Sequence, residues 1–399
     1  MEKKKVVLAF SGGLDTSFCV KYLSEEKGYD VYTAIANTGG FSKEELANIE
    51  KRAVELGAVR HATLDIEQEY YEKSIKYMVF GDILRNGTYP ISVSSERIFQ
   101  AIAIIEYAKS IGADCVAHGS TGAGNDQVRF DMIFNIVAPE IEVIALIREK
   151  RLSREEEIEY LRSHGVDFDF KKAEYSINQG IWGTSVGGKE TLTSSETLPE
   201  EAYPSQLKES KSRRITLTFE KGEFVGLDGK RFDDRIAAIQ ALQAVAAPYA
   251  IGRDMHVGDT IIGIKGRVGF EAAAPMIIIK AHHMLEKHTL TKWQLFWKDQ
   301  IAAFYGNYLH EGQYYDPVMR DMEAMLESSQ RTVSGDVYVD LHPYRFVVVG
   351  IKSEHDLMSN AFGAYGETMS DWTSDDVKGF GKIFGNQNKI WYKVNKGMK

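Results

Sequence analysis

The sequence predicts an α/β protein with an N-terminal doubly wound parallel sheet, a second α+β domain and a C-terminal arm. Three observations lead to this fold class. The first 150 residues alternate short apolar runs with amphipathic segments, the pattern changes near residue 214, and the chain after residue 370 combines aromatic residues with glycine and lysine. Alternation of strands and helices is typical of a parallel sheet with helices on both faces.

The N-terminal part contains short apolar runs of strand length separated by helical periodicity. In residues 97–111, for example, apolar side chains recur every three or four positions, from Ile98 to Ile111, which is the spacing of one helix face. We expect five strands, at residues 6–10, 31–36, 59–64, 114–117 and 143–147. We expect helices at residues 17–26, 43–56 and 97–111. A further helix begins at Ser153, where Glu156 completes a capping box, and ends before Gly165.

The second part of the chain has a different character. Residues 175–212 are rich in Gly, Ser, Thr and Glu, with little periodicity, which is typical of a long functional loop or a crossover between domains. Beyond it we expect strands at residues 215–219, 260–265 and 336–349, and helices at 234–247 and 289–308. The predicted domains are therefore residues 1–168, residues 169–370 and an oligomerisation arm at 371–399.

Composition excludes several classes of protein. The chain has 399 residues and two cysteines, Cys19 and Cys115, without a CxxC pair. This rules out a disulfide scaffold, a thioredoxin-type site and a cysteine-rich zinc module, and it suits a cytoplasmic protein. The formal charge of -9 argues against nucleic acid as the main partner. The apolar runs are strand-sized, so neither a membrane span nor a signal peptide is expected.

The strongest local motif is the glycine-rich loop Ser11-Gly12-Gly13-Leu14-Asp15-Thr16-Ser17, which joins a buried strand to a helix. Glycines allow a tight turn, and a helix start offers free N–H groups and a positive dipole end. These features predict a phosphate site, although the loop lacks the Walker A pattern. The alternative is a polar turn without a ligand.

A second polar loop, residues 118–130, follows the strand predicted at 114–117. It offers five different polar side chains within nine residues: Thr121, Asn125, Asp126, Gln127 and Arg129. Because both loops follow parallel strands, they meet at the carboxyl edge of one sheet. Such a density of polar groups suits a zwitterionic ligand, and the alternative is a solvated loop.

The first loop resembles the signature of the ATP pyrophosphatase group, whose adenine nucleotide alpha hydrolase-like domain binds the pyrophosphate end of ATP there. Together with His118-Gly119-Ser120-Thr121-Gly122-Ala123-Gly124-Asn125-Asp126-Gln127-Val128-Arg129-Phe130, it is similar to the argininosuccinate synthase family. Weaker similarity to that family covers most of the chain, at residues 36–39, 175–178, 182–185, 262–267 and 376–380.

The resemblance implies roles for individual residues. ATP would be bound by Ala9, Phe10, Ser11, Gly12, Gly13, Leu14, Asp15, Thr16, Ser17, Ala36 and Gly119. Aspartate would be bound by Thr121, Asn125 and Asp126. Citrulline would be bound by Tyr89, Ser94, Asn125, Arg129, Ser176 and Ser185. The candidate catalytic residues are Asp15, Asp126 and Arg129.

The implied reaction belongs to arginine biosynthesis and joins citrulline to aspartate in two steps. The ureido oxygen attacks the α-phosphate of ATP, giving citrullyl-AMP and pyrophosphate, and the aspartate amine then displaces AMP to give argininosuccinate. Magnesium accompanies ATP, and the family is usually a homotetramer. Asp15 would help to position magnesium and Asp126 the aspartate amine, and the alternative for each is a helix or turn cap. Such chemistry depends on positioning and charge stabilisation.

No metal site of the protein's own is predicted. The histidines form no clear ligand set, and the adjacent His282 and His283 do not share a helix face. We interpret them as structural or surface residues.

Two positions depart from the family. Aligned on residues 262–267, Gly258 stands where the family has a glutamate and Phe270 where it has a tyrosine, both of which contact citrulline. One interpretation is that Asp259 or water completes an ordinary citrulline site. The other is an N-acylated citrulline, such as N-succinylcitrulline, whose α-nitrogen is a neutral amide. The segment after Tyr89 also differs from the family's pattern, although Ser94 and Arg97 match it.

Two rival functions stay open at this point. One is a tRNA-modifying or amidotransferase member of the same ATP group. The acidic balance of the chain and the missing CxxC weigh against it. The other is a nucleotide-binding protein without turnover, which would not need a second polar loop.

Overall fold

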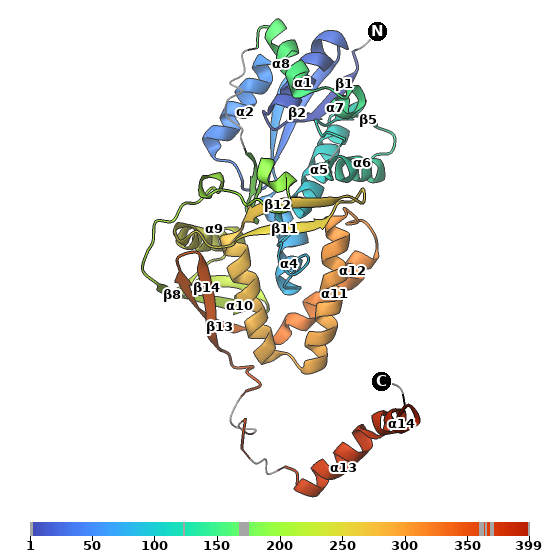
Figure 1. The fold of residues 1–399 in the computed structure, drawn as a ribbon. Helices are drawn as coiled ribbons and strands as arrows, with labels where there is room; N and C mark the ends of the chain where they lie inside the picture. Colours follow the sequence, from blue (N-terminus) through green and yellow to red (C-terminus); the bar gives the residue numbers. More distant parts are fainter. Residues whose placement is uncertain are drawn as a thin grey trace. The chain divides into compact units, whose positions relative to one another are not determined.

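The computed structural model describes residues 3–122, 124–166, 175–358, 363, 365–367 and 371–397 (Figure 1). It divides into two compact units, residues 1–355 and 356–399. The domain boundary predicted between residues 168 and 169 lies outside the described residues.

The N-terminal sheet has five parallel strands in the order β3-β2-β1-β4-β5. Their bounds are β1 Lys5–Ala9, β2 Asp30–Asn37, β3 Arg60–Asp65, β4 Cys115–Ala117 and β5 Glu142–Ile144. The chain proceeds from β1 outward in one direction and then, from β4, in the other. The carboxyl ends of β1 and β4 therefore flank a topological switch point, where ligands of such sheets bind.

Helices cover both faces of this sheet, as the sequence predicted. Val6 and Leu8 of β1 point to a cluster that includes Phe18 and Leu161, whereas Val7 points to a cluster that includes Ile98. Successive side chains of a strand point to opposite faces of the sheet. The apolar residues of β1 are therefore buried on both faces. The helices are α1 Leu14–Lys21, α2 Lys43–Glu55, α5 Ser92–Ser110, α6 Asp126–Val137, α7 Leu146–Lys150 and α8 Arg154–Ser163.

Some helix bounds differ from the prediction. The segment 17–26 is α1 followed by a π-helical turn, Tyr22–Glu26, and α5 begins five residues earlier than expected. The start of α5 is polar in sequence, but its serines are buried, so amphipathic periodicity gave no signal there. The capping box of Ser153 with Glu156 is confirmed. Short helical segments precede α5, at α3 Glu67–Tyr70, the π-helical turn Tyr71–Ile75 and α4 Lys76–Phe80.

Two antiparallel sheets follow, which confirms the α+β character of the second part. One has the order β11-β12-β7-β6 and the other β10-β9-β8-β13-β14. The first consists of β6 Ser176–Gly180, β7 Gly183–Gly187, β11 Arg253–Asp259 and β12 Lys265–Glu271. The second consists of β8 Arg213–Glu220, β9 Glu223–Leu227, β10 Lys230–Arg231, β13 Gly335–His342 and β14 Arg345–Lys352.

Three predictions of local structure were wrong in this part. Residues 260–264 are the turn between β11 and β12, because Thr260 hydrogen-bonds Ile264 across it and Gly263 has φ 83°. The single strand expected at 336–349 is the hairpin β13–β14, which reverses at Tyr344 with φ 63°. The expected loop 175–212 contains the hairpin β6–β7.

The helices of this part are α9 Arg235–Ala246, α10 Ala273–Thr289, α11 Lys292–His310 and α12 Val318–Ser329, and residues 356–399 contribute α13 Ser374–Phe384 and α14 Asn386–Val394. Short 3₁₀ segments occur at Lys189–Leu192, Glu200–Ala202, Ala247–Tyr249 and Gln330–Thr332. No helix of the described residues is long and apolar enough to cross a membrane.

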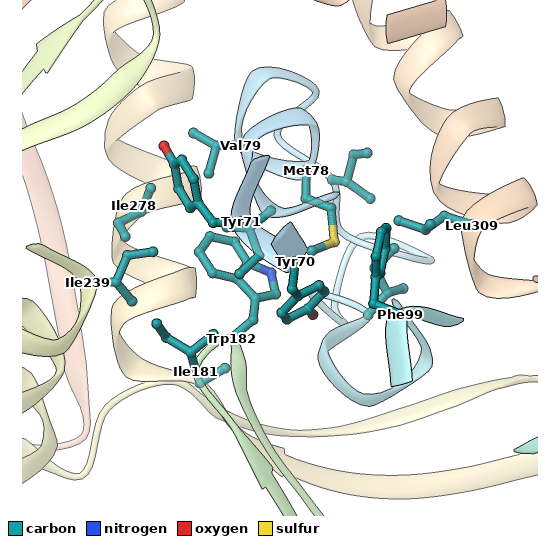
Figure 2. Close-up of a cluster of buried hydrophobic side chains, with 14 of the residues drawn as sticks. Tyr70, Tyr71, Met78, Val79, Phe99, Ile181, Trp182, Ile239, Ile278 and Leu309 are labelled. Atoms are coloured by element: carbon teal, nitrogen blue, oxygen red, sulfur yellow. The ribbon is translucent and has the colours of Figure 1, made fainter. Parts of the chain in front are cut away.

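A shared aromatic core seats the β6–β7 hairpin against the N-terminal part. Trp182, at the tip of the hairpin, is fully buried and lies near Tyr70, with Phe99 of α5 and Ile278 of α10 in the same cluster (Figure 2). Its indole N–H donates a hydrogen bond to the carbonyl oxygen of Pro90 over 3.2 Å. This anchor fixes the hairpin beside the start of α5, where several predicted site residues lie.

Candidate active site

The glycine-rich loop leaves the start of α1 open. Gly13 occupies the N-cap position and therefore provides no side-chain cap, so the first N–H groups of the helix need another partner. Gly12 has φ 76°, and a Cβ there would lie 3.3 Å from the side chain of Ile49. Ser11 is exposed, whereas the Ser17 hydroxyl donates to the Gly13 carbonyl over 2.7 Å. The backbone of this loop can bind an oxyanion, while Ser17 holds its shape.

Asp15, in the first turn of α1, faces a second carboxyl group from α8. Glu157 forms a hydrogen bond with Asp15, and burial together with the Asp15 charge raises the pKa of Glu157. The Glu157 Oε2 atom is buried and has no hydrogen-bond partner among the described residues. Two facing carboxyl groups beside a phosphate loop share a proton or hold a cation. Asp15 is therefore not a helix cap, and Glu157 carried no motif by which the sequence could reveal it.

The second polar loop packs directly against the first. A Cβ on Gly119 would lie 3.0 Å from Cγ2 of Thr16 and 3.3 Å from Cβ of Asp15. His118 shapes this loop, because its Nε2 lies 2.8 Å from Oδ1 of Asp131 and its Nδ1 accepts the Ser120 N–H. The two loops that the sequence placed at one sheet edge are thus in contact.

Asp126 and Arg129 lie together at the start of α6. The Asp126 carboxylate accepts hydrogen bonds from Nε of Arg97 at 3.1 Å and from Nη1 of Arg129 at 2.9 Å. Burial alone would raise the pKa of Asp126, but the two guanidinium groups outweigh it and hold that pKa below its usual value. Asn125 accepts the Ile261 N–H over 2.8 Å, which ties the β11–β12 turn to this loop. Asp126 is an ion-pair partner here and not a cap.

The sequence analysis missed Glu96, a buried acid at the start of α5. Its Oε1 accepts hydrogen bonds from Gln100 at 2.8 Å and from Arg97 at 3.3 Å. Burial raises the pKa of Glu96 to about 7, although Arg97 opposes the shift. Arg97 also donates to Oδ1 of Asn178 in β6 over 2.8 Å. In the sequence, Arg97 stood out only as a residue shared with the family. A single glutamate beside it forms no pattern that indicates a site.

The residues expected to bind citrulline border this network. Tyr89 is buried, and its hydroxyl oxygen accepts the Val93 N–H over 3.2 Å. Ser94 is also buried and donates to the Ile91 carbonyl. Ser176 and Ser185 share one face of the β6–β7 hairpin, because residues 176 and 178 pair with 187 and 185. Asn178, which lies on that same face, bonds Arg97.

Other predicted residues line the two loops. Ala36 lies near the end of β2, where its carbonyl oxygen accepts a hydrogen bond from the side-chain amide of Gln100 over 3.4 Å. Thr121 is exposed, and Phe10 is buried with its N–H bonded to the Ala34 carbonyl. The structure thus collects the predicted site residues around one edge of the N-terminal sheet.

The structure gives no support to Asp259 as a replacement for the family's glutamate. Its carboxylate is largely exposed and pairs with the Lys265 ammonium over 2.5 Å. Gly258, one position earlier in β11, is the residue that faces inward. Phe270 is fully buried with its ring 5.4 Å from that of Tyr89.

His282 and His283, expected to be structural or surface residues, both reach Asp82. Their Nδ1 atoms lie 2.7 Å and 3.0 Å from its two carboxylate oxygens. Asp82, His282 and Glu286 are close enough to share a metal ion. The buried ammonium of Lys298 already lies among them, 2.5 Å from Asp82 and in contact with Glu286. A lysine therefore supplies the positive charge of this cluster.

Two family models match the chain. One, described as the arginosuccinate synthase N-terminal HUP domain, covers residues 5–167, and the other, the arginosuccinate synthase C-terminal domain, covers residues 175–391. Similar proteins include the argininosuccinate synthase of Xanthomonas campestris, 38% identical over 99% of this chain and 100% of that protein. Those of Dictyoglomus thermophilum and Pyrococcus furiosus are each 34% identical, over 98% and 99% of this chain and 98% and 96% of their own lengths.

Proposed function

This chain belongs to the argininosuccinate synthase family, and from that premise we propose how its own residues carry out the family's reaction. It is an ATP-dependent C–N ligase that joins citrulline to aspartate in arginine biosynthesis. The comparisons give no support to an N-acylated citrulline. We assign the binding of the substrates to the two polar loops, to the region around the start of α5 and to the β6–β7 hairpin.

We assign the nucleotide to the contact between the two loops. The open N–H groups at the start of α1 bind the phosphates, and Ala9–Ser17, Ala36 and Gly119 surround the nucleotide. The close packing of Gly119 on Thr16 supports this, because a side chain there would separate the loops. Preorganised N–H groups stabilise charge that develops on phosphate oxygens.

Asp15, with Glu157 behind it, fits a magnesium ion that accompanies ATP. The unpartnered, buried oxygen of Glu157 and its contact with Asp15 are the observations that favour a cation there. Magnesium prefers carboxylate oxygens and substrate phosphates as ligands. When bound it neutralises charge on the phosphates.

The two amino acids are assigned to the network around Asp126. Citrulline is bound by Tyr89, Ser94, Asn125, Arg129, Ser176 and Ser185, and aspartate by Thr121, Asn125 and Asp126. Asp126 accepts hydrogen bonds, so it suits the aspartate amine. Arg97 fixes the position of Asp126 from the opposite side. No enzyme nucleophile takes part, and the rate depends on aligned reactants.

We also propose a cytoplasmic homotetramer with an N-terminal nucleotide-binding region, a synthetase region and a C-terminal oligomerisation arm, divided as the sequence predicts at residues 1–168, 169–370 and 371–399. The arm supports assembly, because α13 and α14 bury none of their residues among the described residues of the unit 356–399. Exposed apolar side chains such as Phe380, Phe384 and Trp391 favour a second copy as their partner.

Release of pyrophosphate tests the assignment. The observation that carries it is the close approach of Gly119 to Thr16 and Asp15, which brings the second polar loop against the open start of α1. Purified protein with ATP, magnesium, citrulline and aspartate should release pyrophosphate and AMP in equal amounts, and no release should occur without citrulline. ATP binding without citrulline-dependent release would instead indicate a nucleotide-binding protein without turnover.

A further inference from the structure

Three buried side-chain nitrogen atoms next to the active site have no partner. They are Nε of Arg85, Nε2 of His256 and Nε2 of His310, judged against all described residues. The two histidines are only 5% and 6% exposed. A buried donor or acceptor without a partner is rare and costs free energy. Three in one place therefore point to a ligand.

Two of the three side chains, Arg85 and His256, meet at Gly258, and His310 is close enough to both for their charges to act on it. A Cβ on Gly258 would lie 2.6 Å from Nε2 of His256 and 2.7 Å from Nη1 of Arg85. His310 is held from the other side by Arg129, whose Nη2 donates to the His310 carbonyl over 2.8 Å. The cluster also adjoins Tyr89, whose ring stacks on that of His256 at 5.1 Å.

The cluster carries positive charge, and the acidic groups that act on Arg85, Asp259 and Glu311, form no ion pair with it among the described residues. Nη2 of Arg85 bonds the backbone carbonyl of Asp259 at 2.9 Å, and within the described chain no carboxylate lies at ion-pair distance from Arg85. The Asp259 carboxylate pairs with Lys265 instead. Burial, assisted by Arg85, lowers the pKa of His256 to about 4, and burial with Arg129 and Arg85 lowers the pKa of His310 to about 2. Both rings are therefore neutral at pH 7 and free to donate one hydrogen bond each.

We propose that Arg85, His256 and His310 form a carboxylate subsite for the amino-acid substrate that the proposed function places beside Tyr89 and Arg129. A guanidinium with two imidazole donors matches a carboxylate in charge and in hydrogen-bonding capacity. This inference rests on the proposed function for the presence of that substrate.

The carboxylate has two possible sources. One is the α-carboxylate of citrulline itself, and the other is a carboxylate carried by a substituent on the α-nitrogen. Both offer the same chemistry to Arg85. A cluster of this charge would repel the α-ammonium group, so that group has to face away from it.

Calorimetric titration of the full-length protein with four probes tests the subsite. The probes are citrulline, its α-carboxamide citrullinamide, N-acetylcitrulline and N-succinylcitrulline. If the α-carboxylate is bound here, citrulline should bind about tenfold or more tightly than citrullinamide, because the contact is charge-assisted. If the substituent is bound here, N-succinylcitrulline should exceed N-acetylcitrulline by a similar factor.

Arg85→Met should abolish whichever of these preferences the wild type shows, and Arg85→Lys should retain part of it. Arg214→Met, which removes an exposed arginine paired with Asp340 in a distant sheet, is the matched control and should leave both ratios unchanged. If Arg85→Met does not fold, His256→Phe keeps a ring against Tyr89 but removes the neighbouring N–H donor, and it should reduce the same ratio. Both ratios remaining unchanged in a folded Arg85 or His256 variant would overturn the subsite.

The readout separates this inference from the proposed function. The subsite is measured by ratios of binding constants, whereas the function is measured by pyrophosphate release from the wild type. A protein that releases pyrophosphate with unchanged ratios in Arg85→Met lacks the subsite but keeps the function. A protein without release, whose ratios change in Arg85→Met, keeps the subsite and loses the function.

Discussion

Asp15 and Glu157 show how one contact between two side chains links fold and chemistry. Two carboxyl groups side by side destabilise a protein unless a proton or a cation lies between them. Asp15 lies in the first turn of α1 and faces Glu157 of α8. The repulsion between the two carboxyl groups therefore acts next to the phosphate loop. Under the proposed function, a cation that accompanies ATP would relieve this repulsion.

Asp15→Ala should therefore abolish pyrophosphate release and leave the fold intact. The loss of one charge-assisted interaction is worth about 1.5–3 kcal/mol, and the variant also loses the cation contact. The free energy of unfolding should not fall, because Glu157 no longer faces a second carboxyl group. A turnover assay and a thermal melt measure both effects. Glu159→Ala, an exposed acid on the same helix α8, is the control, and a wild-type rate in Asp15→Ala would remove this residue from the mechanism.

The buried Glu96 leads to a prediction about how the free energy of unfolding depends on pH. Its pKa is raised by burial from 4.5 to about 7, so the folded state binds this proton more tightly than the unfolded state does. The free energy of unfolding must then fall as pH rises from about 4.5 to 7, by an amount on the order of 3 kcal/mol. Glu96→Gln keeps the acceptor for Gln100 and removes the titration.

Urea denaturation at pH 5 and pH 8 measures this difference. Relative to the wild type, Glu96→Gln should gain stability between the two values, because only the wild type has to ionise the buried carboxyl group. Exposed carboxyl groups elsewhere contribute equally to both proteins and cancel. Parallel pH dependence in the two proteins would show that Glu96 ionises in the folded state as it does in water.

At the scale of elements, the hairpin β6–β7 is seated by close backbone approaches. The Ile181 N–H donates to the Thr38 carbonyl over 2.9 Å, and a Cβ on Gly40 would lie only 1.9 Å from the carbonyl oxygen of Gln179. The turn after β2 and the hairpin can approach this closely only because residue 40 has no side chain. The hairpin in turn carries Ser176 and Ser185.

Gly40→Ala should displace the hairpin and weaken citrulline binding more than ATP binding. Overpacking of this kind costs about 1–3 kcal/mol, which corresponds to roughly five- to 150-fold in the KM for citrulline. Steady-state kinetics with each substrate varied in turn would show the asymmetry. Gly350→Ala, in β14, is the control, because nothing lies within 4 Å of a Cβ there. Equal changes for both substrates would indicate a general loss of structure.

How well each element could be predicted depended on the length of its apolar runs and on the residues that end them. β1 through β5 are short apolar runs ended by polar loops, and their order along the chain sufficed to predict the parallel sheet. In contrast, α10 was missed, because its continuous apolar run from Met276 to Ile279 has the length of a strand and periodicity alone does not distinguish the two. The strand expected at 336–349 contains a turn. The residue of this turn with left-handed backbone is Tyr344, so no glycine marked it in the sequence.

The residues of the candidate site also differ in how well the sequence could predict them. Asp126 and Arg129 belong to one contiguous motif, and the sequence indicated that they act together. Glu157 and Arg85 come from segments without motifs and meet their partners only through packing of α8 and of the loop before α5. Contacts between distant segments leave no trace in the spacing of a single sequence.

On the scale of the whole molecule, one hydrophobic cluster runs through both regions matched by the family models. It contains Val7 of β1, Ile98 of α5, Ile278 of α10 and Val337 of β13. The nucleotide loops and the β11–β12 turn are therefore held by one continuous core across residues 1–355. This explains how Asn125 and Ile261, far apart in the chain, keep a 2.8 Å hydrogen bond.

The arm beyond residue 370 leads to a prediction about assembly. In α13 the apolar residues Val377, Phe380, Ile383 and Phe384 recur at helical spacing, and each is more than half exposed. A helix with such a face gains stability by burying it, at about 1.5–3 kcal/mol for each large side chain. Among the described residues of the unit 356–399, nothing buries α13, and we expect a second copy to cover it.

Deletion of residues 371–399 should then convert a tetramer into smaller species, as measured by light scattering. Replacing Phe380 and Phe384 together by serine should have the same effect while the chain keeps its length, because only the apolar face is lost. Lys378→Ala, on the same helix, is the matched control and should leave the mass unchanged. The active-site residues all lie before residue 356, so the truncated protein should still bind ATP. An unchanged mass after the deletion would show that the arm is not what holds the subunits together.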